Sequence, residues 1–381
     1  MTAYYIFIGI VFVLAIMATS YSKNVFIESE GRYFKQANII FVTIIFFALV
    51  FLYTFRWCNG TDFYNYYLDF QKMKYAKWDT LFENRDILFT LLTYYSYKIF
   101  DGNFIIYNFI LGVLTYLPIV ITIRKHSENF ALSILLYIFM TLYFIPYNTV
   151  RQGIACGLCF LAFSYVYDKQ YIKFFFIMLI AIAIHSSAML FIPIVLLSNR
   201  DSHSKEIYIG VFILLIIFLG LGTFWNYIIK FLNLIGQSKM ASDYKDALSE
   251  GNGISYLRVV VIFIPIILSY IYYNAIKSKN KSNKIDFIIN LSLFGAIFML
   301  FGLKFAILAR ISQYFEIYIV LLYPYILNAF SKEEKRLLTF IIVIVYFLYM
   351  SVLLNSGGNL VPYQYYYDYK GEWMIDIDLS R

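Results

Sequence analysis

Continuous apolar blocks separated by short polar connections make up most of this sequence. They lie at 3–20, 37–56, 103–123, 130–147, 150–167, 171–184, 187–198, 206–224, 254–276, 285–303, 308–330 and 336–354. Most are close to the ~20 residues that a helix needs to cross a hydrocarbon core, and they lack the ~10-residue alternation of a membrane barrel. The pattern predicts an all-α polytopic membrane protein of about 11 to 13 transmembrane helices, in which the short blocks 171–184 and 187–198 form a broken or re-entrant pair.

Composition supports this prediction and adds no soluble domain to it. The chain is 61% hydrophobic and 14% charged, with a mean hydropathy of +0.70. We therefore expect residues 1–381 to form a single integral membrane domain, with 3–20 kept as the first span because a basic start and a cleavage site are missing. Cys156 and Cys159 lie inside an apolar block, which favours packing over a redox or metal pair.

The distribution of Lys and Arg predicts the orientation of the chain. The short connections at 124–129, 168–173, 199–206, 277–284 and 331–336 hold 13 Lys and Arg in 34 residues, against 9 in 85 for the long segments at 57–85, 225–253 and 355–381. Basic loops face the cytoplasm, so the long segments face outward and the net charge of +8 reports topology, not nucleic-acid binding. The outer parts are then a loop at 57–100, in which the Tyr-rich segment 87–100 is an interfacial helix, a loop at 225–253, and a C-terminal tail at 355–381.

Two arginines are the first candidates for a binding site. Arg151 lies in an otherwise apolar block, where an ionised guanidinium needs a lipid phosphate, a substrate anion or a carboxylate as partner. Snorkelling to lipid headgroups is the ordinary alternative. Arg310 is expected at the same membrane face, and two guanidiniums on one diphosphate would form a charge clamp without a metal. We expect Arg151 and Arg310 to bind a substrate diphosphate.

His185 and Asp62 are the candidates for a general base. His185 interrupts the apolar run between two short blocks, where a neutral imidazole could accept a proton, although a lone membrane histidine is more often structural. Asp62 lies in the Tyr-rich stretch 60–67, whose carboxylates and aromatic rings suit a sugar or an ordinary interfacial turn. Neighbours in these motifs are expected to support the site: Gln152, Ser186, Tyr314 and Tyr66. The aromatic tail at 361–369 is interpreted mainly as an interface anchor.

These motifs together resemble the EpsG family of polysaccharide repeat-unit polymerases, which is related in role to the Wzy O-antigen polymerases. The resemblance rests on Gly-Thr-Asp-Phe-Tyr at 60–64, Arg-Gln-Gly-Ile-Ala at 151–155, His-Ser-Ser at 185–187 and Arg-Ile-Ser-Gln-Tyr at 310–314. It is densest between residues 140 and 195. The sequence departs from the family near residues 83–86, where a Glu-Pro pair is expected and absent.

The resemblance implies a multi-spanning glycosyltransferase of the C-type fold in the bacterial plasma (inner) membrane, with its active site at the periplasmic or outer face. Its substrates would be undecaprenyl-diphosphate-linked oligosaccharides, with the growing chain as donor and a new repeat unit as acceptor. A chain-length regulator is a further implied partner. No cofactor or metal is expected, since Gly-rich phosphate loops and metal-ligand spacings are absent from the sequence. A flippase for lipid-linked oligosaccharides and a polysaccharide-modifying acyltransferase are the alternatives.

Overall fold

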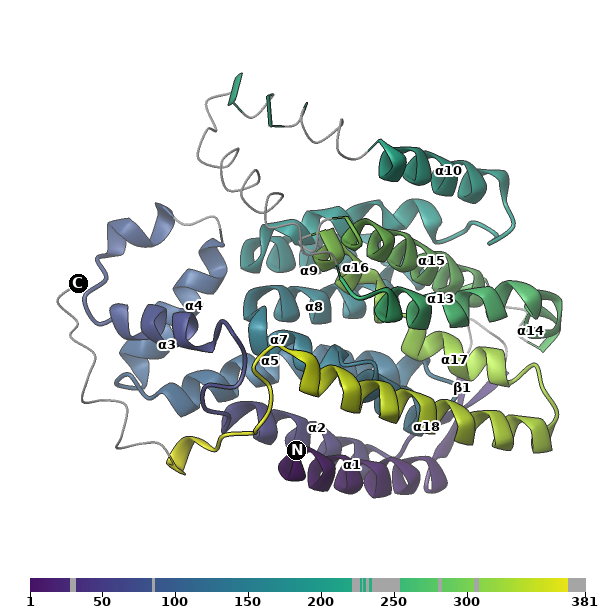
Figure 1. Ribbon diagram of the computed structural model, residues 1–381, viewed down its shortest axis with the longest axis horizontal. Helices are drawn as coiled ribbons and strands as arrows, with labels where there is room; N and C mark the ends of the chain where they lie inside the picture. The colour runs from purple at the N-terminus through teal and green to yellow at the C-terminus, as the bar shows by residue number, and fades with distance from the viewer. Residues whose placement is uncertain are drawn as a thin grey trace. The chain divides into compact units, whose positions relative to one another are not determined.

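The computed structural model describes residues 1–27, 32–83, 86–220, 254–279, 283–304 and 308–368, with a few positions between 227 and 234. Its described part is almost entirely helical (Figure 1). Contacts divide the chain into two compact units, and each is described here by itself. The first unit joins Met1–Met189 to Lys332–Arg381, and the second is Leu190–Ser331. The first unit is therefore discontinuous in sequence.

Several of these helices are long enough to span a membrane. Five helices in the described residues are long and apolar enough to cross a membrane, and two bent helix pairs raise the number to seven. The expected 11 to 13 crossings also counted shorter apolar runs, such as α2 (Ile39–Thr54) and α9 (Tyr171–Ile184). The predicted all-α polytopic membrane protein is confirmed. The predicted outer loop 225–253 lies almost wholly outside the described residues.

The first unit holds most of the predicted spans. Its elements are α1 (Thr2–Ser20), β1 (Lys23–Ile27), β2 (Arg32–Gln36), α2, α3 (Phe63–Lys72), η2 (Trp78–Glu83), α4 (Ile87–Ile99), α5 (Phe104–His126), α6 (Phe130–Phe139), η3 (Leu142–Phe144), α7 (Ile145–Asn148), α8 (Val150–Tyr167), α9, α18 (Lys332–Ser356) and η6 (Tyr366–Asp368). A 3₁₀ helix, η4 (Ser186–Leu197), continues across the boundary. The two strands form an antiparallel hairpin that pairs Lys23 with Gln36.

Small residues set the spacing between helices around the start of α8. A Cβ added at Gly157 would lie 2.7 Å from the carbonyl oxygen of Thr115 on α5. One added at Gly153 would lie 2.7 Å from Cγ of Pro146 on α7. Close backbone approach of this kind is what small residues permit in membrane helices. It fixes the first turns of α8, where Arg151 lies.

Two breaks interrupt predicted spans of the first unit. The block 130–147 bends by 58° between α6 and the segment Leu142–Asn148, and Thr141 adopts a left-handed φ of 65° at the bend. The block 171–198 breaks at His185, whose extended backbone (φ −154°, ψ 112°) ends α9. This second break confirms the expected interruption. The helix α4 has 13 residues, about 20 Å, which is too short to cross a hydrocarbon core of about 30 Å. Its expected place at the interface stays a prediction.

The second unit is built from shorter, bent helices around one long helix. Its elements are most of η4, α10 (Lys205–Leu219), α13 (Tyr256–Ile271), α14 (Tyr273–Lys279), α15 (Lys284–Gly302), α16 (Ala309–Glu316) and α17 (Ile319–Leu327). The pair α13 and α14 bends by 70°. A Cβ at Gly295 of α15 would lie 2.9 Å from the backbone nitrogen of Glu316, so α15 and α16 pack closely.

Candidate functional site

A buried carboxylate, Asp86, gathers the polar groups of the first unit. Its side chain is 8% exposed and lies just before α4. One oxygen, Oδ2, accepts a hydrogen bond from a guanidinium nitrogen of Arg151 at 2.9 Å and lies 3.2 Å from Nδ1 of His185. The other, Oδ1, accepts from the backbone N–H of Ser186 at 3.2 Å. Three helices far apart in sequence, α4, α8 and α9, therefore meet at this network, which we call the Asp86 network.

Local backbone structure explains why these groups are available. Arg151 is the second residue of α8, so its side chain projects from a helix start instead of a crowded middle turn. His185 ends α9, and Ser186 begins η4, where a backbone N–H has no earlier carbonyl of the same helix to bind. The broken span thus supplies both an imidazole and a backbone donor to one carboxylate.

Electrostatics keep Asp86 ionised despite its burial. Burial alone disfavours the charged carboxylate, but the hydrogen bond and charge of His185, the Ser186 N–H and the Arg151 charge together lower the pKa of Asp86 below its usual value. An ionised Asp86 is an acceptor only, so Nδ1 of His185 donates to it. The second imidazole nitrogen, Nε2, is then an acceptor, and the side chain is 26% exposed. The arrangement suits a histidine that takes a proton.

Arg151 also contacts aromatic side chains of α3 and α4. Its side chain is 45% exposed although it binds Asp86. The guanidinium donates a hydrogen bond to the Tyr66 hydroxyl oxygen, and the ring of Phe89 lies 5.8 Å from its central carbon. The Tyr66 and Phe89 rings also contact each other edge to face, with centroids 6.1 Å apart. Arg151 is consequently held by Asp86 and Tyr66 while nearly half of its side chain stays exposed.

The Gly-Thr-Asp turn at 60–62 is joined to the residues that precede Arg151. Asn148 Oδ1 accepts from the backbone N–H of Thr61 and, at 3.2 Å, from its hydroxyl. Gly60 has a φ of +108°, and a Cβ there would lie 2.3 Å from the Tyr147 carbonyl oxygen, so only glycine fits. Asp62 follows at the start of α3, partly exposed, and its carboxylate accepts from the Thr61 hydroxyl at 3.3 Å. The expected role of Asp62 as a base stays a prediction.

The other expected residues lie in different places. Gln152 is buried in the first turn of α8, and Ser186 contributes its backbone N–H while its side chain is exposed. Arg310 and Tyr314 belong to α16 of the second unit, where Arg310 is exposed and Tyr314 is fully buried. The structure thus brings together Arg151, His185, Ser186 and Tyr66, and the expected diphosphate-binding role of Arg310 remains a prediction from the sequence.

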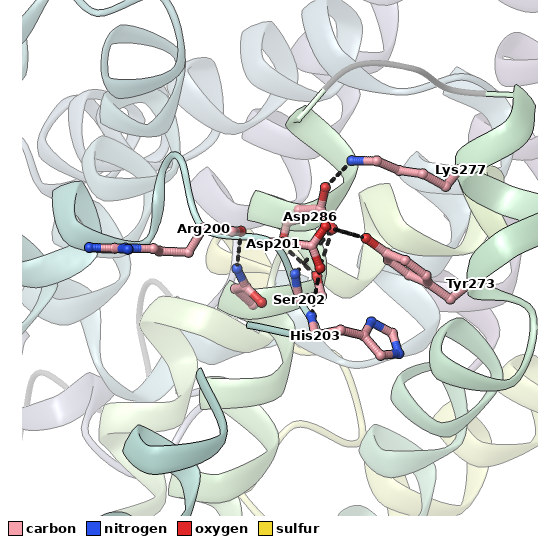
Figure 2. Close-up of polar contacts among 8 residues, drawn as sticks. Arg200, Asp201, Ser202, His203, Tyr273, Lys277 and Asp286 are labelled. Atoms are coloured by element: carbon pink, nitrogen blue, oxygen red, sulfur yellow. Dashed lines mark hydrogen bonds and ion pairs between the residues drawn. The ribbon is translucent and has the colours of Figure 1, made fainter. Parts of the chain in front are cut away.

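A second polar cluster surrounds Asp286 in the second unit (Figure 2). Asp286 Oδ1 accepts from the backbone and hydroxyl of Ser202, at 3.2 and 3.1 Å, and from the Tyr273 hydroxyl at 2.7 Å, while Lys277 binds Oδ2. The Tyr273 hydroxyl also lies 3.0 Å from Asp201. The ring of His203 lies against Tyr273, with centroids 4.2 Å apart. We call this the Asp286 cluster; it joins the turn before α10 to α14 and α15.

Few metal-ligating side chains lie close together in the described residues. Within the part of the chain that the structure describes, no group of three His, Cys, Asp or Glu side chains lies close enough to hold a metal ion. The Asp86 network contributes one carboxylate and one imidazole, with a guanidinium as the third charged group. The chemistry available there is proton transfer and anion binding.

Asp86 is the site residue that sequence reasoning missed. A carboxylate directly before a short apolar helix was the available signal, because such a group at a helix start is either a cap or a partner for a distant cation. Asp86 makes no side-chain cap bond to α4, so the second reading applies. The family's expected Glu-Pro pair is absent three residues earlier, and the structure does not describe the Glu83 side chain.

Comparison with known proteins agrees with the sequence resemblance. No curated protein and no solved structure matches the chain. A family comparison matches the EpsG family over residues 39–365, which includes the Asp86 network, the Gly-Thr-Asp turn and α16. This match covers most of the 381 residues. The chain belongs to the EpsG family.

Proposed function

We propose that this protein is a polysaccharide polymerase that joins lipid-diphosphate-linked oligosaccharide repeat units. Membership of the EpsG family supports a polysaccharide-polymerase, glycosyltransferase-like role. The observation that carries the proposal is the Asp86 network, in which one ionised carboxylate holds both an imidazole and a half-exposed guanidinium. Glycosyl transfer from a diphosphate needs both groups, because one hydroxyl must lose a proton and one diphosphate must leave with its charge.

His185 is the proposed general base. Asp86 holds Nδ1–H, which leaves the Nε2 lone pair to accept a proton and stabilises the imidazolium once it forms. The acceptor hydroxyl gives its proton to Nε2 while its oxygen forms a bond to the anomeric carbon of the donor sugar. The bond from that carbon to the diphosphate oxygen breaks in the same step. The proton then passes from His185 to solvent, so that the site is restored.

Arg151 is the proposed partner of the leaving diphosphate. Negative charge on the bridging oxygen grows as the bond breaks, and a fixed guanidinium stabilises the transition state more than the ground state. Tyr66 and Asp86 hold the side chain from two sides, which reduces the freedom lost on binding. Direct attack without a covalent intermediate inverts the anomeric configuration, which NMR of the product linkage against that of the donor tests.

The proposed substrates and location follow the sequence analysis. The donor is the growing chain on undecaprenyl diphosphate, the acceptor is a single repeat unit on the same lipid, and the reaction takes place at the outer face of the bacterial plasma membrane. The low density of Lys and Arg in the segments 57–85 and 355–381 supports this orientation, because both segments belong to the same unit as the network. Surrounding membrane lipid and a chain-length regulator are proposed partners.

A polymer ladder tests the proposal directly. The gene is deleted and complemented with wild type, His185→Ala, Arg151→Ala or Arg310→Ala, and membrane levels of each protein are measured. Deletion and the first two variants are expected to leave single repeat units on the outer leaflet. The controls are His203→Ala and Arg200→Ala, which remove the same side-chain types from the second unit and should restore the ladder. His203 and Arg200 lie on the turn before α10, outside the Asp86 network.

Two outcomes would overturn the proposal. Normal ladders in both His185→Ala and Arg151→Ala would remove the assigned site. Single repeats confined to the cytoplasmic leaflet would show that the protein moves lipid-linked units across the membrane and does not join them. Arg310→Ala is scored separately, because a normal ladder in that variant removes only its predicted role at the diphosphate.

A further inference from the structure

We infer that the first unit carries a stacking surface for the saccharide chain, beside the Asp86 network. The surface is formed by six aromatic side chains, Phe55, Trp57, Tyr67, Tyr365, Tyr366 and Tyr367, which we call the aromatic platform. This inference rests on the proposed function and adds to it a binding place for sugars of the growing polymer that lie away from the reacting bond. Its evidence comes from the C-terminal segment, which the proposed mechanism does not use.

The C-terminal segment is fixed to the outer loop by backbone hydrogen bonds. The Trp57 N–H donates to the Gln364 carbonyl and the Tyr366 N–H donates to the Phe55 carbonyl, both at 2.9 Å. Arg56 and Tyr365 form an isolated antiparallel β-bridge between these two segments. Figure 1 shows this segment in yellow beyond the end of α18. Each of these pairs is about 300 residues apart in sequence, so the contact is tertiary and specific.

The buried side-chain amide of Asn59 also binds the C-terminal segment. Asn59 is 1% exposed, and its Nδ2 donates to the carbonyls of Leu360 and Pro362 at 2.9 and 2.8 Å. Its Oδ1 accepts from the Gln364 N–H at 2.9 Å. Both the amide nitrogen and the amide oxygen of Asn59 therefore bind the tail. A simple membrane anchor needs no such fixed geometry, since interfacial tyrosines act from mobile segments as well.

The rings of the platform contact one another in a continuous series. Tyr366 and Tyr67 flank Trp57 with centroids 5.2 and 5.5 Å away, and Phe55 lies 5.7 Å from Tyr365. Tyr367 closes the series at 5.6 Å from Tyr365 and 5.5 Å from Tyr366. Tyr367 is 52% exposed and the other five rings are partly exposed. Flat apolar faces with hydroxyls at their edges match the C–H face and the hydroxyls of a pyranose.

Helix α3 connects the platform to the reaction site. Tyr67 packs on Trp57 of the platform, whereas the preceding residue, Tyr66, binds Arg151 of the Asp86 network. Neighbouring residues on a helix point about 100° apart, so one turn of α3 presents one ring to each place. Asn65 on the same turn is exposed and offers an amide for sugar hydroxyls. While the diphosphate-linked end of the growing chain reacts at the Asp86 network, sugars farther along that chain can bind the platform.

A fixed stacking surface predicts an effect on chain length. Holding the polymer between additions reduces its release, and a preorganised surface does so without a further ordering cost. Loss of two rings is expected to weaken binding by about three- to tenfold per ring, and to shorten the mean polymer while single repeats are still consumed. Replacement of the hydroxyls alone leaves the ring faces in place and should have little effect.

The test compares ring removal with hydroxyl removal in the full-length protein. Tyr365→Ala/Tyr367→Ala, the matching double Phe variant, and His185→Ala are expressed at equal levels, and ladders are recorded. Tyr33→Ala is the control, since Tyr33 is 72% exposed on the hairpin and outside the platform. Binding is measured from the fluorescence of Trp57 in purified protein in nanodiscs, after the other tryptophans have been replaced. The probe is polymer from wild-type cells that has been cut into shorter chains by mild acid.

The outcomes separate the platform from the proposed function. Shorter chains and weaker binding in the Ala pair, with normal results in the Phe pair and Tyr33→Ala, support the platform. Unchanged ladders and binding in the Ala pair overturn it, and the proposed function stands if His185→Ala still stops polymerisation. A full ladder in His185→Ala, together with one in Arg151→Ala, overturns the proposed function and the platform with it. Quenching of Trp57 by nitroxide-labelled lipid headgroups, without protection by the probe, overturns the platform in favour of a lipid-facing surface.

Discussion

Asp86 and Asp286 are two buried carboxylates whose surroundings differ in one respect. Each accepts from a backbone N–H of a serine and from a basic side chain. The remaining acceptor capacity of Asp286 is filled by the hydroxyls of Ser202 and Tyr273, whereas Asp86 binds the imidazole of His185. His203, in the same cluster, packs against the rings of Tyr270 and Tyr273 instead.

The comparison shows what distinguishes a reactive carboxylate from a structural one in this protein. Burial and charge pairing are common to both, so neither marks function. The Asp86 network has a titratable partner and a half-exposed arginine, through which the buried charge acts on molecules outside. In the Asp286 cluster the carboxylate binds two hydroxyls, a backbone N–H and Lys277, and these contacts join the turn before α10 to α14 and α15. We therefore expect activity to depend on the first and stability on the second.

The largest expected difference comes from replacing each carboxylate by its amide. Asp86→Asn removes the charge that fixes the His185 tautomer, and turnover of lipid-linked repeats into polymer should fall by as much as about 10⁴-fold, as in other histidine–aspartate pairs. Asp286→Asn should keep a near wild-type rate per folded molecule. Turnover is measured in proteoliposomes, normalised to folded protein by size-exclusion chromatography. A folded but inactive Asp286→Asn protein, or an active Asp86→Asn protein, would reverse the assignment.

A smaller effect is expected when the basic partners are removed. Lys277→Met leaves Asp286 buried without its cation, which should lower the free energy of unfolding by up to about 3–5 kcal/mol. Arg151→Met removes a half-exposed partner, so its cost to stability should stay within about 1 kcal/mol. Its cost should appear instead as a loss of about 10²- to 10³-fold in turnover.

Thermal unfolding in detergent, followed beside turnover, checks this second prediction. The expected pattern is a clear drop in melting temperature for Lys277→Met and a clear drop in rate for Arg151→Met. Equal losses of stability in both variants would show that Arg151 is as structural as Lys277.

The smallest expected effect is a dependence on acid. The pKa of Asp86 in the folded protein is lowered from its usual value of 3.8, mainly because His185, Ser186 and Arg151 outweigh the penalty of burial. A lowered pKa means that the ionised group stabilises the folded state at all pH values above the usual pKa. That contribution is lost as the pH falls through the lower, folded-state value.

The measurement is the difference in melting temperature between wild type and Asp86→Asn as a function of pH. It should be constant from about pH 8 to pH 5 and shrink only below about pH 4. A difference that already disappears between pH 7 and pH 5 would mean that the imidazole, and not the carboxylate, governs the stability of the network.

The apolar pattern was sufficient to predict the class of fold and one of its breaks. The apolar blocks and the interruption at His185 are local features of the sequence, so both could be predicted from it. The bends at Thr141 and Tyr272 were not predicted. They lie inside continuous apolar blocks, where backbone geometry is set by packing against other helices.

The sequence predicted the basic residues of the site but not the carboxylate at its centre. Arg151 and His185 stood out because each is costly in an apolar block. Asp86 did not, since a carboxylate at the end of a polar loop looks solvated, and its contacts span 65 and 99 residues. Such contacts depend on how α4, α8 and α9 pack. The burial of Arg56 was not predicted either, because it also depends on packing between segments. Arg56 is 2% exposed, and its guanidinium lies 3.5 Å from the centre of the Tyr53 ring.

The discontinuity of the first unit has a consequence for biosynthesis. Helix α18 and the C-terminal segment complete that unit, yet the ribosome makes them after all of Leu190–Ser331. At about 5–20 residues per second, the helices up to α9 wait roughly 10 to 40 s for their last partner. During this time Asn59 and the backbone of the loop 55–60 lack the groups that later bind them. The nascent protein is then a natural target for membrane chaperones and quality-control proteases, and shortened chains that end before α18 should be degraded instead of accumulating.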